Sequence, residues 1–366
     1  MNDPTFKKIQ DAILVPMLAI LSGLVVMGIL ILFLKKPLFE SYYIIFSKGF
    51  GCEAYGNCVF ISTLERATPL ILTGLSAVVA FRSGMFSIGQ EGQYLFGAAA
   101  AAWLGYAIHL PPIIHPIVLM LAAMLIGAIY GWIPGILKVK IGVNELLATI
   151  MLNSIAALVV EYLVQFPMRA DKSTTAHSPV IDQSAWLVSF LPGSKWGVGF
   201  VIAVIAVVVV YLYLWRTKYG YEQRMAGQSG RFALYGGIRS DSSAIRAMLI
   251  SGALAGLAGG IEVMGVHHRI MTGFSTGLGF DGLTAAILGQ VHPVGVFIVA
   301  ILFSGLKLGA QLGLQLKLEI PRELGGTIIG FIILFVAAGS LYQSLINRVR
   351  GMISQRQVRR LKGEGH

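Results

Sequence analysis

Residues 61–108 read ISTLERATPLILTGLSAVVAF, then RSGMFSIGQEGQ, then YLFGAAAAAWLGYAI. Two apolar runs, 61–81 and 94–108, flank a segment that carries glycines and polar side chains. A helix that crosses a bilayer needs about 20 apolar residues. Irregular backbone at membrane depth survives only where it is buried in protein or lines a cavity. The stretch therefore predicts two membrane helices joined by a broken segment at 82–93.

The composition of the whole chain extends this interpretation. Of the 366 residues, 56% are hydrophobic and only 12% are charged, whereas a soluble domain has roughly 25% charged residues. This excludes a disordered chain, a nucleic-acid-binding domain and an ordinary cytosolic enzyme. The formal net charge is +11, but the basic residues lie in short segments between apolar runs, as insertion into a bilayer selects. The sequence therefore predicts an all-α polytopic membrane protein that contacts lipid and no nucleic acid.

Ten apolar segments are candidate spans, and the eighth is too short for an ordinary crossing helix. His292-Pro293 breaks the chain before the ninth, because proline does not continue a helix. The ten segments are 13–34, 61–81, 94–108, 113–137, 143–166, 197–215, 247–266, 280–288, 294–312 and 325–345.

Basic residues set the orientation, since cytoplasmic loops retain lysine and arginine. They cluster in the loop 216–246 and again in the tail 347–366, and we place both in the cytoplasm. Lys7 and Lys8 indicate the same side, more weakly, for the N-terminus. If both termini lie in the cytoplasm, the chain must cross the membrane an even number of times. The eighth segment is needed for this number, so we keep it as a half-length, partly unwound crossing.

A short motif recurs in the two halves of the chain, as FSIGQEG at 86–92 and FSTGLGFDG at 274–282. In this topology the copies lie on opposite sides, which is typical of inverted repeats with a substrate path at their interface. Chance matching of glycine-rich strings is the alternative. We divide the chain into an N-terminal span and external loop (1–60), a first repeat (61–166), a middle part with the cytoplasmic loop (167–246), a second repeat (247–346) and a basic tail (347–366).

Two external segments follow from this topology. The first, 35–60, holds Cys52 and Cys58, which pair only if the segment faces an oxidising compartment; two free thiols are the alternative. The second, 167–196, is polar, contains prolines and is long enough to touch a partner.

The fifth span carries the most informative polar residues. Glu145, Thr149 and Asn153 are spaced four apart and share one helical face, and Ala157 and Glu161 are predicted to continue it. Such a line of polar residues should face other helices or a water-filled path. Its residues then either line the path or form hydrogen bonds between helices. In the broken segment, Glu91 either binds cargo or anchors the loop by accepting backbone N–H bonds. The path candidates are Glu91, Gln93, Asn144, Glu145, Thr149 and Asn153.

The loop 216–246 is too long for a tight turn, and short helices are predicted near 220–225 and 231–235. Basic and aromatic side chains on such a helix suit docking to a soluble partner; a solvated face retained for topology is the alternative. Glycines spaced four apart, at 127–135 and 252–260, predict close helix packing. The docking candidates are Glu222, Gly227, Arg231, Tyr235 and Gly237.

Catalytic and cofactor motifs are missing from the sequence. It has no Gly-x-x-x-x-Gly-Lys-Ser/Thr phosphate loop, so ATP is not expected on this chain. The string GQSG at 227–230 resembles a serine protease motif but lies in the cytoplasmic loop, away from membrane depth. His267, His268 and His292 have no carboxylate or cysteine at ligand spacing, so no metal site is expected.

Three of these segments, in order, resemble the permease subunits of bacterial ABC importers of the branched-chain amino acid/ribose superfamily, and most closely the nucleoside and simple-sugar branch. RSGMFSIGQEGQ at 82–93 is similar to the family's R-x-G-x-F-N-I-G-x-E-G-Q, with Ser87 replacing Asn. NELLATIMLN at 144–153 matches N-E-x-x-x-T-I-M-L-N without departure. GQSGRFALYGGI at 227–238 is similar to the family's coupling loop, G-x-N-P-x-A-A-x-Y-A-G-I, with Ser229 and Gly230 replacing Asn-Pro and Phe232 replacing Ala.

The resemblance implies ten helices with two inverted repeats in the bacterial inner membrane. It implies a non-enzymatic chain without a cofactor, paired with a second permease, two ATPase subunits that bind ATP, and an extracytoplasmic solute-binding protein. The length and the first external loop look like the longer permease of purine-nucleoside uptake systems. An ion-coupled secondary transporter that uses Glu91, Glu145 or Asp281 as its coupling carboxylate is the alternative. The exact solute, and whether the second permease is a copy or a paralogue, stay open.

Overall fold

The computed structural model describes residues 22, 25, 26, 28, 29, 31–33, 35–52, 58–170, 175–191, 193–274, 277–314 and 330. The basic tail, most of the first predicted span and nearly all of the tenth lie outside these residues. Within them the structure is helical and contains no β-sheet strand. Contacts divide the chain into two units, residues 50–305 and a unit made of 1–49 with 306–366.

The unit that contains the N-terminus has a helix where the sequence predicted an external loop. Helix α2 (Leu38–Phe50) buries Ile44 and Ile45, and its backbone lies close to the π-helical turn Gly309–Leu314. A side chain at Gly309 would collide with the carbonyl oxygen of Ile45. The sequence analysis placed 35–60 in an external loop without indicating a helix, whereas the structure has α2 there, with Ser41, Ile44, Ile45 and Gly49 buried. The external placement of this segment stays a prediction.

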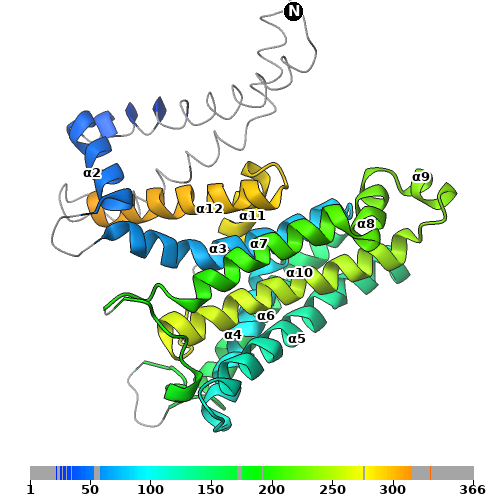
Figure 1. The fold of residues 1–366 in the computed structure, drawn as a ribbon, viewed down its shortest axis with the longest axis horizontal. Helices are drawn as coiled ribbons and strands as arrows, with labels where there is room; N and C mark the ends of the chain where they lie inside the picture. Colours follow the sequence, from blue (N-terminus) through cyan, green and yellow to red (C-terminus); the bar gives the residue numbers. More distant parts are fainter. Residues whose placement is uncertain are drawn as a thin grey trace, which may run out of the picture. The chain divides into compact units, whose positions relative to one another are not determined.

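The 50–305 unit carries the remaining helices (Figure 1). The basic loop 216–246 contains α8 (Lys218–Gln228) and α9 (Gly230–Tyr235), which confirms the two short helices predicted there. The others are α3 (Val59–Arg82), α4 (Gln90–Ala107), α5 (Ile114–Ile136, with the π turn Leu137–Ile141), α6 (Glu145–Gln165), α7 (Val198–Arg216), α10 (Ser240–Glu262, with the π turn Val263–His267), α11 (Leu278–Leu288) and α12 (Pro293–Leu308).

Six helices among the described residues are long and apolar enough to cross a membrane. They coincide with six of the ten predicted spans, whereas a full set of ten is not confirmed. The predicted short eighth segment is the 11-residue helix α11. Gln290 and Val291 have positive φ between α11 and α12, and α12 begins at Pro293, so the chain breaks where His292-Pro293 predicted it. The predicted division into repeats stays a prediction.

Helix α10 lies at the centre of this unit, against α3, α4 and α5 (Figure 1). It runs antiparallel to α3, since Ser76 meets Ser251 with their hydroxyl oxygens 2.9 Å apart and Ala80 packs with Met248. The two predicted glycine stripes meet each other. A Cβ built on Gly127 would lie 2.7 Å from the Cα of Gly256, so only glycine permits this approach of α5 to α10.

The buried line along α6 departs from the predicted one. Thr149 and Asn153 are buried, as predicted, but Ala157 and Glu161 are exposed. The prediction for these two residues is wrong because a helix has 3.6 residues per turn, so a strict spacing of four rotates off the buried face. The buried line continues instead through Ala156, Val160 and Val164.

Candidate functional site

The broken segment between α3 and α4 is held by side chains of α6. The Ile88 N–H donates to the Thr149 hydroxyl at 3.2 Å. Asn153 donates from its amide nitrogen to the Ile88 carbonyl at 2.7 Å, and its amide oxygen accepts from the Gly92 N–H at 2.9 Å. Backbone groups that leave a helix inside a membrane need such partners. Two of the six predicted path residues therefore supply hydrogen bonds to the irregular backbone.

Glu91 joins the broken segment to the start of α11. Its carboxylate is buried, accepts a hydrogen bond from the Gly279 N–H at 2.7 Å, and also interacts with the backbone N–H groups of Gly277 and Phe280. The first N–H groups of a helix lack partners within the helix and favour negative charge. The Thr73 hydroxyl, midway along α3, contacts the Leu278 carbonyl. Helix α11 therefore begins halfway along α3, with the Glu91 carboxylate at its N-terminus.

Two glutamines at the start of α4, one on each side of Glu91 in the chain, carry buried amide atoms without a hydrogen-bond partner among the described residues. Both side-chain amide atoms of Gln90 and the amide oxygen of Gln93 are buried without a partner among the described residues. Buried polar groups are usually paired, so such orphans indicate a missing water or ligand. Gln93 was a predicted path residue. Gln90 was not, and only its place in a polar segment between apolar runs could have indicated it.

Asn144 and Glu145 occupy the first turn of α6. Asn144 caps the helix, since its side-chain oxygen accepts from the Leu146 N–H at 2.9 Å. Glu145 pairs with Lys138 at 2.7 Å and faces the backbone of Phe86. Asn144 thus stabilises the start of α6, whereas Glu145 connects α6 to Lys138 and to the broken segment. The structure places them apart from the buried group formed by Glu91, Gln93, Thr149 and Asn153.

The basic loop 216–246 binds directly to the end of α3. The Gln223 amide donates to the Val79 carbonyl at 2.5 Å and accepts from the Tyr213 hydroxyl at 3.0 Å. Gly227 packs on the first residues of the broken segment, where a Cβ would lie 2.7 Å from the Gly84 nitrogen. Glu222 forms an ion pair with Arg246 of α10 at 2.8 Å. Helix α8 is therefore fixed to both α3 and α10.

Helix α9 instead faces away from the unit. Phe232, Leu234 and Tyr235 are exposed, Tyr235 to 92%, and Arg231 is exposed beside them. Ser229 caps the helix by accepting from the Phe232 N–H at 3.4 Å, which gives the protease-like string a structural role. Gly237 has a positive φ of 72° in the turn that ends α9. The result is a short apolar ridge on a basic loop.

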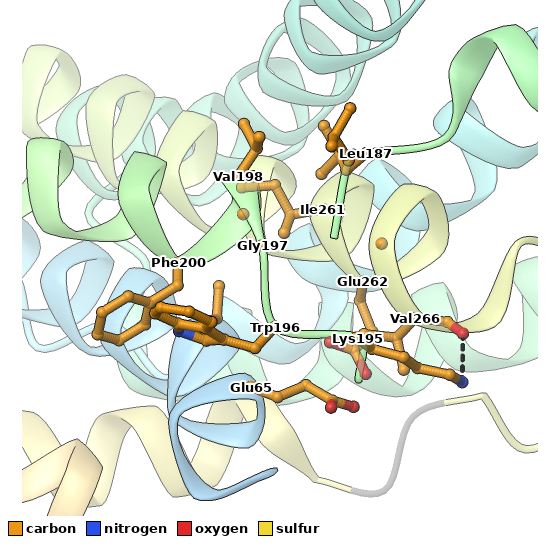
Figure 2. A pocket seen from close by; sticks show the side chains of 14 residues that line it. Glu65, Leu187, Lys195, Trp196, Gly197, Val198, Phe200, Ile261, Glu262 and Val266 are labelled. Atoms are coloured by element: carbon orange, nitrogen blue, oxygen red, sulfur yellow. Dashed lines mark hydrogen bonds between the residues drawn. The ribbon is translucent and has the colours of Figure 1, made fainter. Parts of the chain in front are cut away.

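A charged group that the sequence analysis did not single out lies at the opposite end of α3 and α10. Figure 2 shows Glu65, Glu262 and Lys195 around a small cavity, with the Lys195 ammonium donating to the Val266 carbonyl at 2.6 Å. Burial and the charge of Lys195 lower the pKa of the adjacent His268. The cavity has a volume of about 20 Å³, room for one water molecule. This group could have been predicted from Glu65 and Glu262, because both are acidic residues inside predicted spans.

Comparison with known proteins identifies the family. Residues 59–337 match the family described as "Branched-chain amino acid transport system / permease component". The chain belongs to this permease family. The resemblance drawn from three motifs is thereby confirmed, and the chain is a permease subunit of an ABC importer, a multi-pass membrane protein.

Three relatives of this permease are named transporter subunits. The guanosine ABC transporter permease protein NupP of Bacillus subtilis is 35% identical over 81% of this chain and 85% of its own. The nucleoside ABC transporter permease protein NupB of Lactococcus lactis is 31% identical over 85% of each chain. The glucose ABC transporter permease protein TsgB13 of Haloferax volcanii is 30% identical over 80% of this chain and 79% of its own. No solved structure matches the permease.

Proposed function

We propose that this permease forms half of the membrane path for a nucleoside, in an importer completed by a second permease, two ATPase subunits and an extracytoplasmic solute-binding protein. Two of the three relatives above carry guanosine or nucleoside in their names, and the third carries glucose, so a simple sugar is the second candidate. A paralogous second permease is supported by NupQ of Bacillus subtilis, a guanosine permease that is 25% identical to this chain, beside NupP in the same organism. ATP is bound by the ATPase subunits.

The proposed topology places both termini in the cytoplasm of a bacterium, with the α8–α9 loop on the same side. Two inverted repeats are supported by the antiparallel α3 and α10 and by the short motif that follows each of them. In both copies an irregular segment precedes a helix, α4 in one and α11 in the other. Glu91 of the first copy contacts the start of α11 in the second, as expected for a site at a repeat interface.

The path is proposed to run beside the start of α4. The unpartnered amides of Gln90 and Gln93 are donors and acceptors of the kind that a nucleobase or a ribose hydroxyl needs. Glu91, Thr149 and Asn153 use their polar atoms on backbone groups, so we assign them to positioning this segment. Glu145 is assigned to the same positioning role through its contact with the Phe86 backbone, and Asn144 caps the helix that carries it. A neutral cargo fits a path without a dense charged site.

One observation carries the mechanism, namely the attachment of α8 to the end of α3 through Gln223 and Gly227. Closure of the ATPase dimer on ATP binding would push the exposed ridge of α9. Because α8 is hydrogen-bonded to α3 and packed on Gly84, that push reaches the broken segment. Thr149, Asn153 and Glu91 then pass it to α6 and α11, which alternates access to the path.

Uptake by reconstituted vesicles tests this proposal. The complete importer with its binding protein should accumulate radiolabelled guanosine only when ATP is present on the ATPase side. Labelled glucose in a parallel experiment distinguishes the second candidate cargo. Accumulation by vesicles that contain this chain alone, driven by a pH gradient without ATP, would overturn the proposal in favour of an ion-coupled transporter.

A further inference from the structure

Two arginines and a histidine surround one tryptophan at the end of the unit that carries the α8–α9 loop. The guanidinium carbon of Arg82 lies 5.3 Å from the ring centroid of Trp215, and that of Arg224 lies 5.5 Å from it. The His292 ring centroid is 4.8 Å from the same ring. Cations stack favourably on tryptophan, but this arrangement brings two positive charges to one place.

No carboxylate neutralises this group among the described residues. Arg246, near Arg224 in the same part of the chain, is paired with Glu222 at 2.8 Å, whereas neither Arg82 nor Arg224 forms an ion pair with a described residue. Burial and the charge of Arg82 lower the pKa of His292, as expected where positive charge is unbalanced. The group therefore has the electrostatics of an anion site.

The hydrogen bonds of the two arginines point to the same conclusion. Arg82 donates from Nε to the Val291 carbonyl at 2.9 Å, which leaves its terminal nitrogens free for another acceptor. The Nε of Arg224 is buried and has no partner among the described residues. A buried donor without an acceptor destabilises a protein. An anion with several oxygens, placed between the two guanidinium groups, would satisfy both.

The location selects the anion. Arg82 ends α3 and Trp215 lies one residue before the end of α7, so both lie at the ends of helices that are long and apolar enough to cross a membrane. Tryptophan is enriched at this level of a bilayer, and basic pockets between helices on the cytoplasmic side bind anionic headgroups. Guanidinium groups match phosphate geometry through paired hydrogen bonds.

We propose that Arg82, Arg224 and Trp215 form a binding site for the phosphodiester headgroup of an anionic phospholipid in the cytoplasmic leaflet. The bound phosphate would bridge α3 and α8 beside the Gly227 contact, and so strengthen the attachment of the cytoplasmic loop to the bundle. The proposal rests on the orientation proposed above, and its test measures binding and stability rather than transport.

Lipid titration of the purified, delipidated importer complex provides the test. Phosphatidylglycerol should raise the thermal unfolding midpoint of the wild-type complex by several degrees, whereas phosphatidylcholine and inorganic phosphate should not. Native mass spectrometry of the same complex should retain phosphatidylglycerol at collision energies that remove phosphatidylcholine. An equal shift with inorganic phosphate would overturn the lipid assignment, and equal retention of both lipids would overturn the site.

Matched variants locate the site. Arg224→Gln removes one guanidinium without touching the Arg82–Val291 hydrogen bond, and should lose most of the shift caused by phosphatidylglycerol. Arg239→Gln makes the same charge change at an exposed position before α10 and should keep the shift. An undiminished shift in Arg224→Gln would overturn the proposal. If that variant does not assemble, the lipid retention of the wild-type complex still decides the outcome.

Discussion

The carboxylate of Glu91 lies 2.7 Å from the backbone nitrogen of Gly279, although the two residues are 188 positions apart in the chain. The contact is tight, because a side chain added at Gly279 would lie 2.5 Å from the Cα of Glu91. The broken segment after α3 and the half-length helix α11 are thus joined at one point. A movement of either segment must be accompanied by the other or must break this contact.

Glu91→Ala should lower the free energy of unfolding by roughly 3 kcal/mol, because hydrogen bonds to a charged group contribute roughly 1.5–3 kcal/mol each. Glu91→Gln keeps one acceptor oxygen and should lose about half as much. Thermal unfolding of the purified protein measures both. Glu161→Gln is the control, since Glu161 is exposed and, among the residues that the structure describes, accepts a hydrogen bond only from Gln165 on its own helix. Unchanged stability in Glu91→Ala, with a raised KM for uptake, would instead favour contact with cargo.

Gln223→Leu should reduce coupling between the loop and the bundle. The variant removes the hydrogen bonds to Val79 and Tyr213, which together contribute about 2 kcal/mol. We expect ATP hydrolysis by the complete importer to continue while uptake per ATP falls severalfold. Gln228→Leu, at an exposed position of the same helix, should leave this ratio unchanged. A normal ratio in Gln223→Leu would contradict transmission through α8.

Most of the helices could be predicted from the sequence, because membrane spans depend on length and apolarity alone. The two short helices of the cytoplasmic loop and the half-length α11 were also predictable, since glycine, proline and charge mark their ends. Helix α2 was missed because it has only 13 residues and polar side chains interrupt it, so no apolar run of span length marks it. Its burial depends on contact with residues more than 250 positions later, which a local pattern does not contain.

The site was predictable only in part. Spacing of four placed Thr149 and Asn153 on one buried face, but could not reveal that both bind the backbone of a segment about 60 residues earlier. For Glu91 the sequence left two alternatives, cargo binding and acceptance of backbone N–H bonds, and did not indicate α11 as the partner. Gln90 has no periodic signal, and the group around Trp215 is assembled from four separate segments. Such sites depend on tertiary contacts between distant residues.

Gly127→Ala should destabilise the helix pair α5–α10. The added methyl group would lie 2.7 Å from the Cα of Gly256 and collide with the carbonyl oxygen of Gly252. Forced overpacking of this kind costs about 1–3 kcal/mol, so the thermal unfolding midpoint and the yield of monodisperse protein should fall. Gly265→Ala is the matched control, because its nearest neighbour would be Leu187 at 3.7 Å. Equal behaviour of the two variants would show that the glycine stripes are not needed for packing.

Cys52 and Cys58 are joined by a disulfide in the structure. In the proposed topology they face the oxidising side of the membrane, where such a bond persists. A maleimide reagent should therefore label neither cysteine in the native membrane and both after reduction. Full labelling without a reductant would show free thiols and would contradict the disulfide.

Tyr235→Ala should uncouple the importer without unfolding this chain. The Tyr235 side chain is 92% exposed, so its removal costs little internal packing. Loss of an aromatic anchor from a protein interface weakens the binding free energy by about 2 kcal/mol or more. We expect normal amounts of permease in the membrane, weaker association with the ATPase subunits in co-purification, and uptake reduced at least tenfold. Tyr221→Ala is the control, because Tyr221 is an exposed aromatic residue of α8 rather than of the α9 ridge. If Tyr235→Ala co-purifies with the ATPase subunits and transports as the wild type does, the ridge of α9 is not the docking surface.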